Sequence, residues 1–484
     1  MLLSLFLSHA VACPSPSLDP LDLIRYGDDF LSQPLPWNAT LEDCATACCV
    51  SYPDVCVSFS YNNPQPIRTC VGKYCCEQGK VCCMLKSGMG VLENNTYGKA
   101  VRTGYFPAAP LSPGPSPPFS NSTDILGVKF GEVKWWNGTN GDTWPTAWSA
   151  DGVVLGWDCD AHGSPMSLWQ LDGDPYSGDL SPSLVGGLQP INYSYLCGYL
   201  GKTGAYPYIN VKPAGMAAYG DGSLLTGVSC MNYGDDAGFN RQHNIVGFIA
   251  RSTDGGISWT NVTTPGELFS GRFASPVFVS CGRANDQGCL QDGYQYIFFP
   301  ASFDGQSYWD NNDCAYLARA LPGETLWQPS SYTFFSGFSA DGGVIWTNDS
   351  LLAQPVMQFG NMLGENAVTY NPYLKKYLLA NYGFIDNNGK PRPWHTQPFM
   401  NPHRTQLLLL EADAPWGPWR MFHRDDNSAL APGLYTPTFP SAYLRPINTT
   451  TNEATLTMFF SCLDGAPECR YTLNYVTVTL SLAA

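Results

Sequence analysis

The sequence of 484 residues predicts a mainly β protein, a five-bladed β-propeller preceded by a small disulfide-rich α+β domain. Three observations predict this fold. A turn motif of eight residues recurs along the chain. From residue 124 onward, short β-rich runs alternate with Gly, Asn, Asp and Pro. Near the N-terminus, nine cysteines fall within residues 44–83.

The turn motif sets Ser, Asp, Gly and Trp at its first, third, fifth and eighth positions. It occupies residues 252–259 and 339–346, and a variant with one extra residue occupies 149–157. Asp followed by Gly favours a tight turn with positive φ, and Ile257 and Trp259 alternate along the strand expected after it. The motif resembles the Asp-box of sialidases and other carbohydrate-active propellers, in which it is a structural hairpin on the outer rim. It therefore predicts the fold and not the function.

Residues 124–484 are expected to form the propeller, because radial repetition protects strand edges that an open sheet would expose. At about 70 residues per blade the length accommodates five blades, with six as the competing count. The clearest predicted strands are 152–157, 245–250, 294–299, 376–380, 406–410 and 475–480.

Composition restricts the partners. The net charge is −15, which opposes binding to nucleic acid or to an anionic membrane. Charged residues make up only 13% of the chain and aromatic residues another 13%, so neutral polar ligands such as polysaccharides or other glycans fit best.

The N-terminus predicts export. Residues 1–12 form an apolar run that ends in an Ala-x-Ala site, as in a signal peptide, although a lipobox ending at Cys13 is an alternative. No later apolar run reaches the length of about 18 residues that a membrane span needs. Eight Asn-x-Ser/Thr sequons agree with a secreted glycoprotein.

Residues 13–104 are predicted to be a disulfide-stabilised domain. Zinc binding is the rival interpretation of its cysteines, but no His lies between Cys44 and Cys83. A short helix over 41–49 and strands over 56–61 and 82–86 are expected. This pattern resembles PAN/apple domains, which bind proteins or glycans and carry no catalysis.

A proline-rich stretch, 105–123, is predicted to be an extended linker to the propeller. The propeller's eight cysteines permit complete pairing. Two pairs are close enough in sequence to be local clips across loops, Cys281 with Cys289 and Cys462 with Cys469.

The most suggestive chemistry lies in the first blade. Asp142 precedes one expected strand, and Asp158 and Asp160 follow the next, so an antiparallel hairpin brings these carboxylates together at the propeller axis. Trp144 would offer sugar rings an apolar platform. Glycoside hydrolysis needs paired carboxylates, one as general acid and the other as base or nucleophile. The competing interpretation is that these acids are ordinary turn residues.

Asp158, Asp160 and His162 could instead bind a structural calcium ion through their oxygen and nitrogen atoms. No other cofactor is expected.

Further candidates lie on predicted loops. Glu365 precedes a run typical of an inner strand and is a candidate third catalytic acid. The candidates for substrate binding are Trp144, Asp158, His162, Asp236, Arg241 and Trp309, with Arg241 suited to clamping a hydroxyl or carboxylate. Each of them could also be an ordinary solvated loop residue.

A second resemblance covers most of the propeller. The string Gly-Asp-Thr-Trp-Pro at 141–145, with a following Trp and Asp-Gly hairpin, is similar to the secreted propeller family catalogued as DUF4185, as are 316–319, 366–371 and 414–419. Some members are endo-acting glycosidases on D-arabinan. The resemblance implies that first-blade acids act in the reaction, here Asp142 and Asp160, although the string Asp-Cys-Asp at 158–160 departs from the family.

Other classes fit less well. The predicted first blade contains no Arg for a sialidase carboxylate site, and the chain has no Gly-x-Ser-x-Gly elbow, P-loop or dinucleotide signature. The sequence therefore predicts a secreted glycoside hydrolase, endo-arabinanase-like, that acts on a cell-wall or extracellular polysaccharide. The alternatives are a non-catalytic glycan-binding or adhesion propeller and a structural cell-wall protein.

Overall fold

The computed structural model divides the chain into two compact units. Each unit is described by itself. In the first unit the described residues are 17–18, 23–26, 29–35, 40–51, 58–62, 69–71, 74–76, 81–86, 91–94, 101–105, 386 and 388. In the second they are 113–138, 141–160, 166–188, 210–232, 243–286, 289, 292–365, 367–385, 389–392, 404–426, 430, 433–462 and 469–484.

The first unit combines one helix with three sheets, as the sequence predicts. The helix α1 (Leu41–Ser51) starts at a capping box, in which Thr40 Oγ1 accepts a hydrogen bond from the backbone N–H of Asp43, and the Asp43 carboxylate accepts one from the N–H of Thr40. A disulfide, Cys44–Cys83, joins α1 to the sheet.

The largest sheet described in this unit has five strands in the order β1-β9-β4-β7-β3, and β2-β8 and β5-β6 form two separate two-stranded sheets. The strands are β1 (Ser17–Leu18), β2 (Leu23–Tyr26), β3 (Asp29–Leu35), β4 (Ser58–Asn62), β5 (Thr69–Val71), β6 (Tyr74–Cys76), β7 (Val81–Lys86), β8 (Val91–Asn94) and β9 (Val101–Tyr105).

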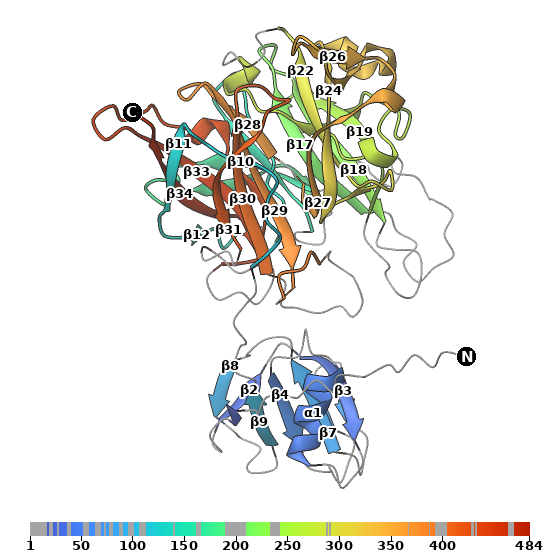
Figure 1. Cartoon of the computed structure of the whole chain (residues 1–484), viewed down its shortest axis with the longest axis vertical. Coiled ribbons are helices and arrows are strands. Elements are labelled where there is room, and N and C mark those ends of the chain that lie inside the picture. Colours follow the sequence, from blue (N-terminus) through green and yellow to red (C-terminus); the bar gives the residue numbers. More distant parts are fainter. Residues whose placement is uncertain are drawn as a thin grey trace. The chain divides into compact units, whose positions relative to one another are not determined.

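The second unit is a five-bladed β-propeller, which confirms the predicted fold class (Figure 1). Blade 1 consists of β13 (Thr146–Trp148), β14 (Val154–Asp158), β15 (Ser167–Asp172) and β16 (Ser181–Leu188). Blade 2 consists of β17 (Asn210–Ala218), β18 (Leu224–Asn232), β19 (His243–Ser252) and β20 (Thr260–Asn261), with β23 (Ser307–Tyr308) on β19. Blade 3 consists of β21 (Val277–Phe278), β22 (Gln295–Ala301), β24 (Asn312–Ala320), β25 (Thr333–Phe338) and β26 (Val344–Thr347), with β27 (Pro355–Leu363) on β24.

Blade 4 consists of β28 (Ala367–Asn371), β29 (Lys376–Ile385), β30 (Arg404–Ala412), β31 (Arg420–Asp425) and β10 (Ser120–Asn121). Blade 5 consists of β32 (Leu434–Thr438), β33 (Glu453–Cys462), β34 (Asn474–Leu482) and β11 (Ile125–Phe130), with β12 (Lys134–Trp135) also on β34. Short 3-10 helices in the described loops are Gly271–Phe273, Arg283–Asn285, Glu324–Trp327, Pro329–Ser331, Ser350–Leu352 and Ser441–Tyr443. Among the helices described, none is long and apolar enough to cross a membrane.

Successive blades meet through their first strands. β13 contacts β17, β17 contacts β21, β21 contacts β28, and β28 contacts β32, so these strands surround the axis. The middle strands are buried on both faces because each blade is packed between two others. All nine residues of β30 are buried, which explains the uninterrupted apolar run Leu407–Leu410.

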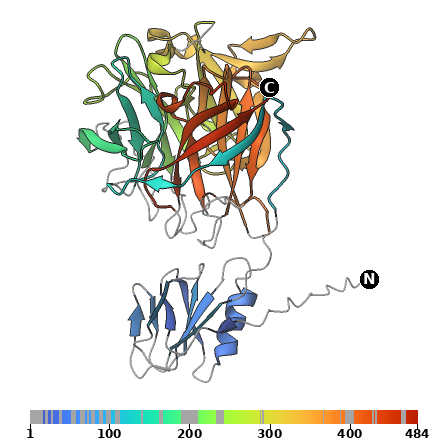
Figure 2. The same ribbon diagram turned by 90° about the vertical axis from the view of Figure 1, so that its left-hand side faces the viewer.

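The ring is closed by strands from the two ends of the propeller sequence. β11, from near the start of the propeller sequence, pairs antiparallel with β34, the last strand of the chain. Figure 2 shows the cyan strand β11 beside the red strands of blade 5. This pairing joins residues about 350 positions apart and places the start of the propeller sequence in the last blade, from which the chain continues into blade 1.

The recurring turn motif forms hairpins between the outer strands β19 and β20 and between β25 and β26, whereas its variant at 149–157 joins β13 and β14, the two inner strands of blade 1. The hydroxyl of Ser252 donates to the carboxylate of Asp254 (2.7 Å), and the same pairing joins Ser149 to Asp151 and Ser339 to Asp341. The strand that follows the motif at 252–259 begins at Thr260, one residue beyond Trp259.

The last part of the predicted linker packs on the propeller. β10 pairs with β31, and the backbone oxygen of Gly114 accepts a hydrogen bond from Arg424. The predicted limits of the linker, 105 and 123, stay a prediction.

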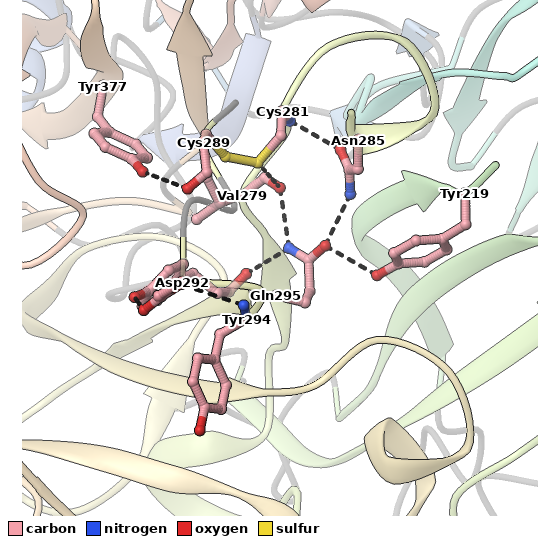
Figure 3. The surroundings of a disulfide bond; sticks show 10 residues. Tyr219, Val279, Cys281, Asn285, Cys289, Asp292, Tyr294, Gln295 and Tyr377 are labelled. Atoms are coloured by element: carbon pink, nitrogen blue, oxygen red, sulfur yellow. Dashed lines mark hydrogen bonds between the residues drawn. A yellow bond between two sulfur atoms is a disulfide. The ribbon is translucent and has the colours of Figure 1, made fainter. Parts of the chain in front are cut away.

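A polar cluster connects blades 2, 3 and 4 around the disulfide Cys281–Cys289 (Figure 3). The amide of Gln295 accepts hydrogen bonds from the Tyr219 hydroxyl (2.9 Å) and from Asn285 (2.8 Å). The hydroxyl of Tyr377, on blade 4, donates to the carbonyl of Cys289 (3.0 Å). These bonds satisfy polar groups that would otherwise be buried without partners.

The predicted disulfide clips Cys281–Cys289 and Cys462–Cys469 are confirmed. The even cysteine count permits complete pairing, but the structure does not realise it, because Cys159 and Cys314 are free thiols. Each is fully buried, in blade 1 and blade 3 respectively, and its sulfur contacts other groups instead of a second cysteine.

An ion cluster fixes the entry of the chain into the propeller. The buried carboxylate of Glu411 accepts a hydrogen bond from Ser122 and lies 3.4 Å from the Lys376 ammonium. Lys376 also pairs with Asp124 and Asp413, and it lowers the pKa of Asp124. The cluster thus ties the residues between β10 and β11 to blade 4.

We expect Lys376→Met to destabilise the propeller by about 3 kcal/mol, because the buried Glu411 carboxylate then depends on the more distant Arg420 guanidinium (3.7 Å) for a compensating charge. Thermal unfolding monitored by circular dichroism would measure this. The matched control is the exposed neighbour, Lys375→Met, which should change stability little. Equal effects of the two substitutions would contradict the role assigned to the cluster.

Candidate active site

The ends of the inner strands bring polar groups from all five blades to the axis. We call these residues the axial cluster: Asp142, Cys159 and Asp160 of blade 1, Lys212 of blade 2, Ser275 of blade 3, Glu365 of blade 4 and Tyr435 of blade 5. Each lies in or next to the first strand of its blade, except Cys159 and Asp160, which follow β14.

Asp142 is held by backbone and side-chain bonds. Its main chain pairs with that of Cys159 in an antiparallel bridge (N···O 2.9 and 2.8 Å), as expected for the two ends of a hairpin. The Cys159 thiol donates to Oδ1, and the Tyr435 hydroxyl donates to Oδ2 (2.7 Å). Only 7% of Asp142 is exposed. Burial raises the pKa of Asp142, while the Lys212 charge and these two hydrogen bonds oppose the increase.

Lys212 and Asp160 form a partly enclosed ion pair beside Asp142. The Lys212 ammonium donates to Asp160 Oδ2 and lies 3.2 Å from the sulfur of Cys159. Asp160 has a φ of 62°, an uncommon conformation for a residue other than glycine. About a third of its side chain is exposed, whereas that of Lys212 is almost fully enclosed.

Glu365 occupies a drier environment. It is 8% exposed, and the Ser275 hydroxyl donates to its Oε1 (3.2 Å). Burial raises the pKa of Glu365 to about 8, and the negative charge of Asp142 acts in the same direction. Glu365 is therefore mostly protonated at neutral pH.

An aromatic group packs behind Asp142. Tyr382, Phe384 and Tyr435 are buried together, and Trp309 and Tyr471 lie half-buried against them. The Tyr382 hydroxyl donates to the carbonyl of Trp309 (2.7 Å). The loop carrying Trp309 is also fastened to β29 by Asn311, whose side chain bonds both the N–H and the carbonyl of Phe384. The Trp309 ring is thus positioned rigidly.

A small pocket lies at the axis next to Glu365. Every blade contributes to its lining: Thr143, Trp144, Pro145, Pro213, Ala214, Val277, Glu365, Ala367, Thr436, Pro437 and Thr438. Most of these side chains are apolar, so Glu365 is the acidic group of a largely apolar wall.

Three described groups could together ligate a metal ion. Asp142, Cys159 and Asp160 each offer one ligand atom, all within 4.8 Å of one another. The ammonium of Lys212 already contacts two of these three groups, and a cation would have to displace it. The donor set therefore fits a resident ammonium group better than a metal ion. The predicted calcium ligands differ from this set, since Asp158 is fully buried at the end of β14 and His162 lies outside the described residues.

The structure brings together the three acids predicted as catalytic, Asp142, Asp160 and Glu365. Of the predicted binding residues, Trp309 lies in the aromatic group behind Asp142, while Trp144 is 1% exposed and packs against Trp136. Asp236 and Arg241 lie outside the described residues.

Sequence reasoning missed Cys159, Lys212, Ser275 and Tyr435. One signal was present for Lys212, which is the lone charge within the otherwise largely apolar strand 210–218. Ser275 and Tyr435 lie in unremarkable sequence, and only the closing of the ring brings them to the axis.

Known proteins were compared with the chain. No family model matches the sequence, and no curated protein matches it. Solved structures similar to this chain include a GH43_1 enzyme from Xanthomonas citri complexed with xylotriose, with 11% identity over 73% of this chain and 92% of that chain and a TM-score of 0.40. Others are the α-L-arabinofuranosidase PaAbf62A from Podospora anserina in complex with cellotriose (12%, 77% and 94%, TM-score 0.32) and a levansucrase of Bacillus subtilis (9%, 68% and 81%, TM-score 0.35).

We expect the thiols of Cys159 and Cys314 to resist alkylation in the folded protein. Both are fully buried, and burial raises the pKa of the Cys159 thiol well above its usual value and that of Cys314 to about 12. Peptide mapping after treatment with N-ethylmaleimide would measure modification of each cysteine, with denatured protein as the control. Rapid modification of Cys159 before unfolding would contradict the enclosed site.

Proposed function

We propose that the protein is a secreted glycoside hydrolase in which Glu365 is the general acid and Asp142 is the base or nucleophile. The observation that carries this proposal is the contrast between two buried carboxyl groups at one axis. Asp142 is contacted by a thiol and a phenol and interacts with the Lys212 cation, whereas Glu365 has one hydroxyl partner. Carboxyl groups whose environments favour opposite protonation states are suited to acid and base roles.

In this reaction Glu365 transfers its proton to the glycosidic oxygen as the bond to the anomeric carbon breaks. Asp142 either removes a proton from the attacking water or attacks the anomeric carbon itself, after which water releases the sugar. Asp160, predicted from the sequence to be the partner of Asp142, is engaged with Lys212. We therefore assign it no proton transfer.

The proposed substrate is a neutral polysaccharide. The net charge of −15 disfavours anionic polymers, and the pocket beside Glu365 is largely apolar. Trp309 and Tyr471, half-buried next to the Asp142 environment, are suited to stacking against sugar rings.

Export is part of the proposal. The apolar N-terminal run and the disulfides in both units fit an oxidising compartment. The first unit would then act as an apple-like module that binds a protein or glycan near the substrate.

A second candidate is a glycan-binding propeller without activity. It is favoured by the low exposure of both acids, 7% and 8%, because a substrate must reach them to be cleaved. Binding of a polysaccharide without any release of reducing ends would select this candidate.

Asp142→Asn and Glu365→Gln should each reduce hydrolysis by about 10²-fold or more, because each removes a group that transfers a proton or attacks the sugar. The measurement is release of reducing ends from a panel of neutral polysaccharides, including arabinan and xylan. The exposed Glu132→Gln is the matched control and should retain full activity. Activity that persists in both site variants would refute the assignment.

The rate should also fall as the pH rises through about 8. The pKa of Glu365 is raised to about 8, so the acid form that donates the proton is present below this pH and is lost above it. A pH profile of kcat/KM would measure the alkaline limb. A rate that stays level well above this value would rule out Glu365 as the acid.

A further inference from the structure

We propose that Lys212 is a positioning residue that keeps Asp142 ionised, so that this internal cation sets the acidic limit of the reaction. The consequence for catalysis rests on the function proposed above. The pairing of Lys212 with Asp142 can be tested without any substrate.

The location of Lys212 requires an explanation. It lies in β17, the inner strand of blade 2, among Val211, Pro213 and Ala214, and is 7% exposed. Burying an ammonium group is unfavourable unless nearby charges and hydrogen bonds compensate for lost water. An apolar residue would fill such a position at lower cost, so a function for the charge is the simpler explanation.

The contacts of Lys212 point to Asp142. The sulfur of Cys159 lies 3.2 Å from the ammonium and also donates its proton to Asp142 Oδ1. One sulfur atom thus touches both groups. The charges of Lys212 and Asp142 attract each other strongly because the surrounding site contains little water.

The other described groups facing Asp142 supply no positive charge, although Cys159 and Tyr435 also favour its ionised form through their hydrogen bonds. Asp160 and Glu365 are acids, and Cys159, Tyr435, Tyr382 and Tyr471 are neutral donors or are held neutral by burial. Among the described groups that act on the pKa of Asp142, Lys212 is the positively charged one. Asp160 orients that cation through their ion pair, while its own negative charge opposes ionisation of Asp142.

The first test measures stability. The pKa of Asp142 is raised in the folded protein, so its burial costs more stability as the pH rises above the ordinary value. Without the Lys212 charge this cost increases. The melting temperature of Lys212→Met should therefore fall further below that of the unsubstituted protein as the pH is raised from about 4 to about 8.

The same substitution made in Asp142→Asn protein isolates the pair. There the part of the pH dependence that belongs to Asp142 should disappear, while the loss of the Asp160 ion pair and of the charge acting on Glu365 remains. An unchanged pH dependence in the Asp142→Asn background would overturn the proposal. If Lys212→Met does not fold, Asp160→Asn replaces it, since removing this negative charge should ease ionisation of Asp142 and reduce the pH-dependent cost.

The second test uses the proposed activity. Lys212→Met should move the acidic limb of the kcat/KM profile upward by about one pH unit or more, and Lys212→Arg should restore it. Asp160→Asn should move the limb in the opposite direction. A purely structural role would lower the rate without these shifts, and unshifted limbs would overturn the proposal.

The outcomes separate the two proposals. Pairing between Lys212 and Asp142 in the stability test, with no hydrolysis of any polysaccharide, would leave this inference standing and refute the proposed function. Hydrolysis that depends on Asp142 and Glu365, without any such pairing, would do the reverse.

Discussion

The structure depends on the closing of the ring between its first and last blades. β11 pairs with β34 in blade 5 and leads the chain into blade 1. Between these two blades, the Tyr435 hydroxyl of blade 5 donates a hydrogen bond to Asp142 of blade 1. The N–H of Thr143 also donates to Ser461 of blade 5 (3.1 Å). Closure of the ring and the environment of Asp142 are therefore linked. If blades 1 and 5 separated, Asp142 would lose its hydrogen bond from the Tyr435 hydroxyl, and water would enter the site. The contact between Tyr435 and Asp142 therefore both completes the candidate site and connects the last blade to the first.

The axial cluster combines groups that would each be unfavourable alone. Two buried acids and a buried ammonium are tolerated because they compensate one another through short hydrogen bonds and charge pairs. The compensation is unequal. Asp142 accepts two hydrogen bonds and faces the Lys212 charge, whereas Glu365 accepts one from Ser275, and burial raises the pKa of both carboxyl groups. A symmetric arrangement of the same residues would not support acid and base chemistry at a single pH.

Sequence patterns anticipated the local features. Turn chemistry predicted the hairpins at Asp254 and Asp341, and the short spacing of Cys281 and Cys289 predicted their disulfide. The hairpin around 142–160 also placed Asp142 and Asp160 together, because its two ends must be neighbours. Complete pairing of the cysteines was not realised, since an even count says nothing about distance. Trp144 is an aromatic residue in a suggestive string, yet it belongs to the packed interior. Burial of a single side chain depends on neighbouring blades and does not follow from its own segment.

By itself the sequence determined the β-rich repeat, the turn positions, the acidic and weakly charged surface, and the first-blade acids. These depend on local backbone preference, spacing and composition. Only the tertiary structure decided that Tyr435 and Lys212 act on Asp142 and that Ser275 bonds Glu365 at the same axis, because these residues come from separate blades and converge only when the ring closes. The tertiary structure also decided that Glu365 lies among mainly apolar side chains, while Asp142 is stabilised by hydrogen bonds and the Lys212 charge. The physical reason is that proton affinity depends on desolvation and nearby charge, which are properties of the assembled axis and not of any one strand.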